Sequence, residues 1–83
     1  MSSFQDYYYS NIACKIRFYR IKSGLTQEEL SAIIGKNSKY IGHIERCERY
    51  ISNKIIIKLM EFWNIQPAEF FNFDEKYIFN SKL

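Results

Sequence analysis

The sequence contains few of the residues that cross-link a chain or interrupt its helices. Its 83 residues include one proline, three glycines and two cysteines. Cys14 and Cys47 are too few for a disulfide framework and match no metal-ligand spacing, so we expect reduced thiols and no bound metal. A second interpretation stays open for Cys47, because neighbouring Arg46 and Arg49 could lower the pKa of its thiol and make it a redox sensor.

Long apolar runs are also absent. The longest one, Ile55–Ile57, is far shorter than the roughly 20 residues that a membrane-spanning helix needs. The first residues, Met1–Asp6, lack the basic start and the apolar run of a signal peptide. We therefore expect a soluble, cytoplasmic protein with no membrane partner.

The residue patterns of an active site are missing as well. The sequence shows no glycine-rich phosphate loop, no carboxylate pair and no catalytic triad. His43 is the only histidine, and no cysteine, aspartate or second histidine lies at ligand spacing from it. These absences predict a protein that is not an enzyme and binds no cofactor.

The charged residues are unevenly distributed. Residues 15–58 carry ten basic and four acidic side chains, a net charge of +6, whereas the other residues together carry −3. A basic centre between acidic ends favours a polyanionic partner that binds the middle of the chain. An ordinary solvated surface is the alternative at this point.

Apolar periodicity and capping residues predict five short helices with short connections, an all-α bundle in a single domain of residues 1–83 with its core in residues 11–71. Thr26 and Glu29 form a capping box at the start of the second helix. The segment before Asn11 has no clear period, and its tyrosines either pack on the domain or stay loose. The tail Asn72–Leu83 is ambiguous. The predicted helices are Asn11–Ser23, Thr26 to Gly35, Asn37 or Ser38 to Arg46, Ser52–Asn64 and Pro67–Phe71.

The second and third predicted helices form a helix-turn-helix unit over residues 26–46. A helix that enters the major groove, which is roughly 12 Å wide, needs an outward face without bulky apolar groups. The outward face of the third helix is predicted to hold Ser38, Lys39, Gly42, His43 and Arg46, which are small, polar or cationic. This pattern favours DNA binding, and the alternative is a solvated face of a plain structural bundle.

Two motifs resemble those of the Cro/repressor-type (Xre) helix-turn-helix family. They are Gly24–Leu30 and Tyr40–Arg46, and the resemblance extends over about residues 11–71. It implies a five-helix transcriptional regulator whose recognition helix, roughly Ser38 to Arg46, reads a double-stranded DNA operator. The stretch Tyr40–Ser52 further resembles the controller proteins of restriction–modification systems. That resemblance implies a repressor or an autoregulatory controller.

The resemblance also implies roles for individual residues. Contacts to base edges fall to Ser38, Lys39 and His43. Arg20 and Glu45 match a structural pair that ties the first helix to the third. Contacts to DNA phosphates fall to Gln27, Lys36, Asn37, Tyr40, Arg46 and Arg49, and Tyr40 matches a position that touches either phosphate or core.

Two positions depart from the family pattern. Gly42 stands where family members often have a small polar residue, and it weakens a helix by roughly 1 kcal/mol relative to alanine. Two explanations remain open: Gly42 lets the backbone approach DNA closely, or it leaves the helix looser until DNA binds. Cys47 stands where a helix-ending glycine is common, so we expect a differently shaped turn there.

The fourth predicted helix has more apolar residues than one face can bury. A surplus of this kind indicates an interface, and the family resemblance implies a two-fold homodimer on a near-palindromic operator. The predicted interface residues are Ile55, Ile57, Phe62 and Phe70. Alternatively the tail, with Tyr77–Phe79, covers this surface within one chain. An antitoxin-like module that binds another protein through the fourth helix and the tail is the alternative function. No small-molecule ligand is expected.

Overall fold

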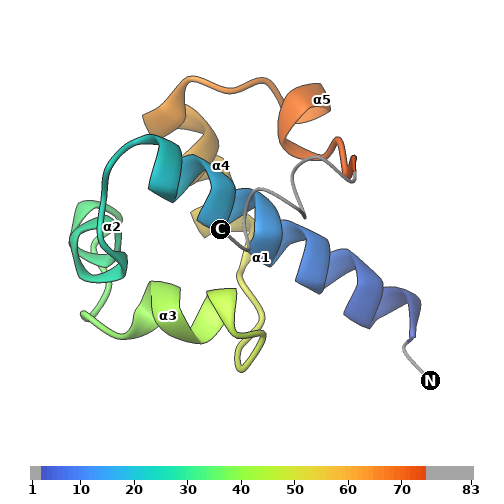
Figure 1. The fold of residues 1–83 in the computed structure, drawn as a ribbon, viewed down its shortest axis with the longest axis horizontal. Helices are drawn as coiled ribbons and strands as arrows, with labels where there is room; N and C mark the ends of the chain where they lie inside the picture. Colours follow the sequence, from blue (N-terminus) through green and yellow to red (C-terminus); the bar gives the residue numbers. More distant parts are fainter. Residues whose placement is uncertain (1–2, 75–83) are drawn as a thin grey trace.

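The computed structural model describes residues 3–74, which form five α-helices around one core (Figure 1). The predicted all-α bundle is therefore confirmed. Within the described residues no helix is both long and apolar enough to cross a lipid bilayer. In Figure 1 the long first helix runs diagonally through the molecule, with the second and third helices on one side and the fifth helix on the other. The helices are α1 (Phe4–Lys22), α2 (Gln27–Ile33), α3 (Tyr40–Glu45), α4 (Asn53–Trp63) and α5 (Pro67–Phe70).

Helix α1 begins at Phe4, so the predicted start at Asn11 is wrong. Ser3 and Asp6 form a capping box: the Ser3 hydroxyl accepts a hydrogen bond from the Asp6 amide at 3.1 Å, and the Asp6 carboxylate accepts one from the Ser3 amide at 3.4 Å. Asn11 lies inside the helix, where its side-chain amide donates to the Tyr7 carbonyl at 2.7 Å. The segment that lacked an apolar period is therefore helical.

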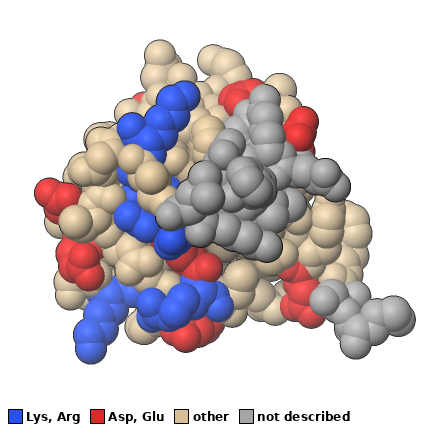
Figure 2. Space-filling model, in the orientation of Figure 1, with Lys and Arg blue, Asp and Glu red and all other residues tan. Residues whose placement is uncertain are grey.

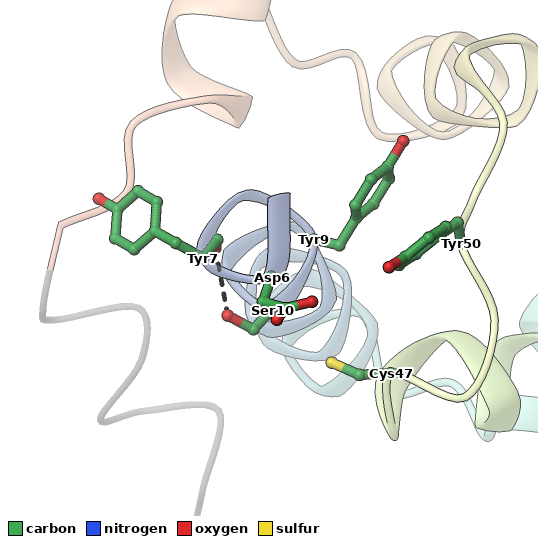
Figure 3. A pocket seen from close by; sticks show the side chains of 6 residues that line it. All are labelled: Asp6, Tyr7, Tyr9, Ser10, Cys47 and Tyr50. Atoms are coloured by element: carbon green, nitrogen blue, oxygen red, sulfur yellow. Dashed lines mark hydrogen bonds between the residues drawn. The ribbon is translucent and has the colours of Figure 1, made fainter. Parts of the chain in front are cut away.

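The tyrosines of this added segment pack on the domain. The Tyr8 ring lies parallel to that of Phe71, with centroids 6.4 Å apart, and the Tyr9 ring stacks on Tyr50 at 4.3 Å. Figure 3 shows Tyr9, Tyr50 and Cys47 on the same side of α1. These three side chains help to line an open cavity of about 400 Å³. The first two turns of α1 are thus fixed against both the α3–α4 loop and the segment after α5.

The predicted start of α2 and both predicted ends of α4 are confirmed, whereas α2 ends at Ile33, two residues before Gly35. The Thr26 hydroxyl accepts from the Glu29 amide at 3.0 Å, and the Glu29 carboxylate accepts from the Thr26 amide at 2.8 Å. Ser52 caps α4, and Asn64 ends it in the left-handed conformation with φ of 54°. Pro67 occupies the first turn of α5, which ends at Phe70, one residue before the predicted end.

Helix α3 is shorter than predicted, because a turn precedes it. The Asn37 side-chain oxygen accepts a hydrogen bond from the Lys39 amide at 3.0 Å, which closes a turn over Asn37–Lys39 and delays the helix until Tyr40. Ser38 and Lys39 therefore lie in the turn and at the helix cap, not within the helix. At the other end Cys47 adopts φ of 59°, the conformation that glycine usually supplies. The expectation of a differently shaped turn after α3 is therefore wrong.

Lys15 connects the middle of α1 to α5 through hydrogen bonds. Its side chain is fully buried, and its ammonium group donates to the carbonyl oxygens of Glu69 at 2.7 Å and Asn72 at 3.2 Å. A cation at this position also suits the negative end of the helix dipole. The hydroxyl of Tyr19, one turn further along α1, donates to the Glu69 carboxylate at 3.0 Å. The segment after α4 is thereby held against the core.

Candidate nucleic-acid interface

A buried serine, Ser31, links helices α2 and α3 through hydrogen bonds. The sequence patterns did not single it out. The Ser31 hydroxyl donates to the Gln27 carbonyl at 2.8 Å and accepts from the Ile41 amide at 3.0 Å. It thus bridges α2 to the first turn of α3, whose amides lack helical partners. The only signal in the sequence was a serine on the inward face of α2, next to Leu30.

Glu45 connects three helices at the back of this unit. Its side chain is only 2% exposed and accepts from Arg20 Nε at 2.6 Å, Arg20 Nη2 at 3.1 Å and Arg17 Nη1 at 3.4 Å. Arg20 also donates to the Leu25 carbonyl at 2.8 Å, just before α2 begins. The structure therefore brings together Arg20 and Glu45, the pair implied by the family resemblance, and adds Arg17 to it.

Gln27 crosses from α2 to α3 and takes part in the same network. Its side-chain amide donates to Glu45 Oε1 at 3.0 Å. Gly42 is buried below it, and a Cβ atom at Gly42 would lie 3.0 Å from Gln27 Oε1 and 3.1 Å from Arg46 Nη1. The predicted outward position of Gly42 is therefore wrong, because the Gln27 side chain covers this part of α3.

The remaining polar residues of the unit lie at the surface. Figure 2 shows basic side chains gathered at the lower left, the side on which α3 lies in Figure 1. His43 is half-buried on α3 itself. Five of the predicted DNA-contacting residues are exposed beyond the ends of α3, and they are Lys36, Asn37, Ser38, Arg46 and Arg49. Lys39, at the cap of α3, is exposed as well.

Tyr40 is not a surface residue, so its predicted phosphate contact is wrong. The side chain is 2% exposed and belongs to the core cluster. Burial raises the pKa of its phenol, against the opposing effect of the Arg49 guanidinium. The Lys36 ammonium lies 5.3 Å from the centroid of the ring and the Arg49 guanidinium 5.0 Å from it.

Arg46 has an acidic neighbour that the sequence analysis did not single out. Its Nε atom lies 3.1 Å from the carboxylate of Glu48, and both side chains are about half exposed. The hydrogen bond from Arg46 lowers the pKa of the Glu48 carboxyl. An exposed pair of this kind adds little to stability, because water and salt screen it.

The surroundings of Cys47 argue against a redox sensor. Burial raises the pKa of its thiol, and the nearby Cys14 and Asp6 act in the same direction. A reactive thiol requires the opposite shift. Both cysteines are free thiols. Among residues 3–74 no group of histidine, cysteine, aspartate and glutamate could hold a metal ion.

The residues predicted for a dimer interface divide into two groups. Ile55 and Phe70 are buried in the core of the single chain, so their assignment to an interface is wrong. The Ser52 cap starts α4 in a register that turns Ile55 inward, whereas Ile57 and Phe62 remain 45% and 46% exposed. The tail residues Tyr77–Phe79, the alternative cover for this surface, lie outside the described residues.

A comparison with family models finds one match, described as helix-turn-helix, over residues 16–70. The matched region extends from the middle of α1 to the end of α5 and covers more than half of the chain. It omits the first three turns of α1. No curated protein and no solved structure matches the chain.

Proposed function

Because the chain belongs to the helix-turn-helix family of DNA-binding transcriptional regulators, we propose that it binds a specific, near-palindromic operator as a homodimer. One observation carries the proposal: polar and cationic side chains occupy the outward side of α3 and the turn before it, on a unit that Ser31 and Glu45 hold together. A rigid unit of this kind suits insertion into the major groove.

In this proposal Ser38, Lys39 and His43 contact base edges. Lysine donates to guanine acceptors, and serine and histidine can donate or accept at either type of pair. Their placement at the start and on the outward side of α3 supports this role, since residues near the N-terminus of a recognition helix enter the groove furthest. The phosphate contacts fall to Gln27, Lys36, Asn37, Arg46 and Arg49, which fix the position of the protein on the duplex.

A selection from randomised duplexes tests the proposed base contacts. We expect the double substitution Lys39→Ala and His43→Ala to broaden the selected sequences, because base-edge contacts are lost while most phosphate contacts remain. Lys58→Ala is the matched control, since Lys58 is an exposed lysine on α4. The same selected sequence before and after the double substitution would contradict the assignment.

The proposed mode of regulation is occupancy. A dimer bound ahead of a gene either blocks polymerase or recruits it, and an autoregulatory controller does so at its own promoter. The finer proposal of a restriction–modification controller rests on the stretch Tyr40–Ser52. Protection of the chain's own promoter from nuclease digestion, beside genes for an endonuclease and a methyltransferase, is the expected result. A locus without these genes would remove the controller assignment and leave the regulator assignment intact.

A second candidate function is binding to another protein, and the same purified samples test it. The exposed Ile57 and Phe62 side chains on α4 would also suit a different protein, as in an antitoxin. Stable co-purification with the product of a neighbouring gene, together with no DNA binding at low salt, would favour that function over a regulator.

A further inference from the structure

Tyr40 brings together two cations from opposite ends of α3. Lys36 lies in the turn before the helix, and Arg49 follows it. Both charged groups stand over the same phenol ring, at 5.3 Å and 5.0 Å from its centroid. These distances are within the range of a cation–π interaction, in which the negative face of the ring attracts the cation.

Three arginines near α3 are already paired with carboxylates: Arg17 and Arg20 pair with Glu45, and Arg46 pairs with Glu48. Among the described residues no carboxylate forms an ion pair with Lys36 or Arg49. Lys39 has no ion pair among the described residues either, but only Lys36 and Arg49 share the Tyr40 ring. Two like charges that share one ring repel each other, and residues 3–74 supply no carboxylate to neutralise them. An external polyanion would neutralise both charges.

We propose that Tyr40 is a positioning residue that holds the charged groups of Lys36 and Arg49 ready for neighbouring phosphates of double-stranded DNA. This inference rests on the proposed function. It gives Tyr40 an indirect part in DNA binding, through the faces of a ring that is itself buried.

The physical advantage is preorganisation. Lysine and arginine side chains lose much rotamer freedom when they are fixed on a phosphate, and that loss weakens binding. A ring that already confines both side chains reduces the loss when DNA binds. The ring also attracts both cations to one place beside α3, although like charges repel each other.

Substitutions that change the charge distribution of the ring but not its shape test the proposal. The full chain is prepared with Tyr40→Phe and with a series of fluorinated phenylalanines at the same position, up to pentafluorophenylalanine. Fluorine withdraws electron density from the ring face, so each step weakens the attraction for cations. Binding to a labelled duplex of random sequence is measured by anisotropy over a range of salt concentrations. Thermal unfolding shows which variants are folded.

We expect the affinity and the salt dependence to fall together along the series, with Tyr40→Phe as the reference. The slope of log K against log salt should fall by about 1 to 2 for each bound chain, because each lost phosphate contact removes about 0.9. Replacing Lys36 and Arg49 by methionine in the Tyr40→Phe background should lower the slope by the same amount.

Two results would overturn the inference, and only one of them would also overturn the proposed function. Equal slopes for Tyr40→Phe and its folded fluorinated counterparts would remove the role of Tyr40 and leave DNA binding intact. The graded series keeps this comparison possible if the most fluorinated variant does not fold. A wild-type chain that does not bind DNA even at low salt would overturn the proposed function and this inference together.

Discussion

At the scale of single residues, Gly42 shows how a contact between two helices can favour one amino acid at a position. A glycine in a helix costs roughly 1 kcal/mol relative to alanine, yet a Cβ atom here would press on Gln27 and Arg46 at 3.0 and 3.1 Å. Both neighbouring atoms are ends of flexible side chains, so they can move aside. The loss would then fall on the hydrogen bond from Gln27 to Glu45 rather than on the fold.

Gly42→Ala is therefore expected to change the free energy of unfolding by less than about 1 kcal/mol, because the gain in helix propensity offsets the lost hydrogen bond. In a Gln27→Ala background the same substitution should stabilise the protein by roughly 1 kcal/mol, since only the flexible, half-exposed end of Arg46 then remains close to the new methyl group. Urea unfolding of the four proteins measures this coupling. Equal effects in both backgrounds would show that Gln27 does not depend on Gly42.

Cys47 is the second residue with an identifiable conformational cost. Its φ of 59° is unfavourable for a residue with a Cβ atom and ordinary for glycine. Cys47→Gly should raise the free energy of unfolding by about 0.5–1 kcal/mol, and urea denaturation measures it. Cys47→Ala is the matched control, because it removes the thiol and keeps the strain. Equal stabilities of the two variants would contradict the argument from strain.

At the scale of elements, the turns of α1 that precede Asn11 depend on a capping box that the sequence analysis did not identify. Aspartate takes the place of the usual glutamate in the capping box at Ser3 and Asp6. Ser3→Ala should cost about 1 kcal/mol. Because the first turns of α1 carry Tyr8 and Tyr9, their amides should also exchange hydrogen faster in this variant. Ser10→Ala is the control, since Ser10 lies within the helix and caps nothing. Unchanged exchange in Ser3→Ala would show that ring packing alone holds these turns.

Helix ends that could be predicted from the sequence are fixed by residues only a few positions away. The end that was predicted wrongly depends on packing against the rest of the molecule. Thr26, Ser52 and Asn64 act on amides and carbonyls a few residues away, so the sequence was sufficient to place them. The start of α3 was misplaced because Asn37, itself a good cap, closes a separate turn with Lys39 instead. Both conformations satisfy local rules, and packing decides between them.

The candidate site shows the same division. The unit of α2 and α3 and its exposed polar residues could be predicted from local patterns. The burial of Tyr40 could not, because it depends on how α3 lies against the core. Ile55 was assigned to the wrong surface for the same reason: apolar periodicity finds an apolar face but does not identify its neighbour.

At the scale of the whole molecule, Ile57 and Phe62 remain as the exposed apolar residues of α4. If they form the proposed two-fold interface, Ile57→Glu with Phe62→Glu should yield a monomer, because like charges would meet across the interface. Sedimentation at micromolar concentration measures the mass of each protein. Ile33→Glu is the matched control, since Ile33 is equally exposed on α2. A monomeric wild-type protein, or a double variant that stays dimeric, would contradict the interface.

The buried ammonium group of Lys15 has a consequence for the order in which the chain is synthesised. Its carbonyl partners lie 54 and 57 positions further along the sequence. The ribosome therefore synthesises Lys15, α2 and α3 before it has made the residues that complete the surroundings of that charge. The segment that contacts DNA is translated early, but its scaffold is finished only when Glu69 and Asn72 emerge. A nascent chain completes the surroundings of Lys15 only after translation has passed these two residues, and a chain terminated before them lacks both hydrogen-bond partners of the buried ammonium group.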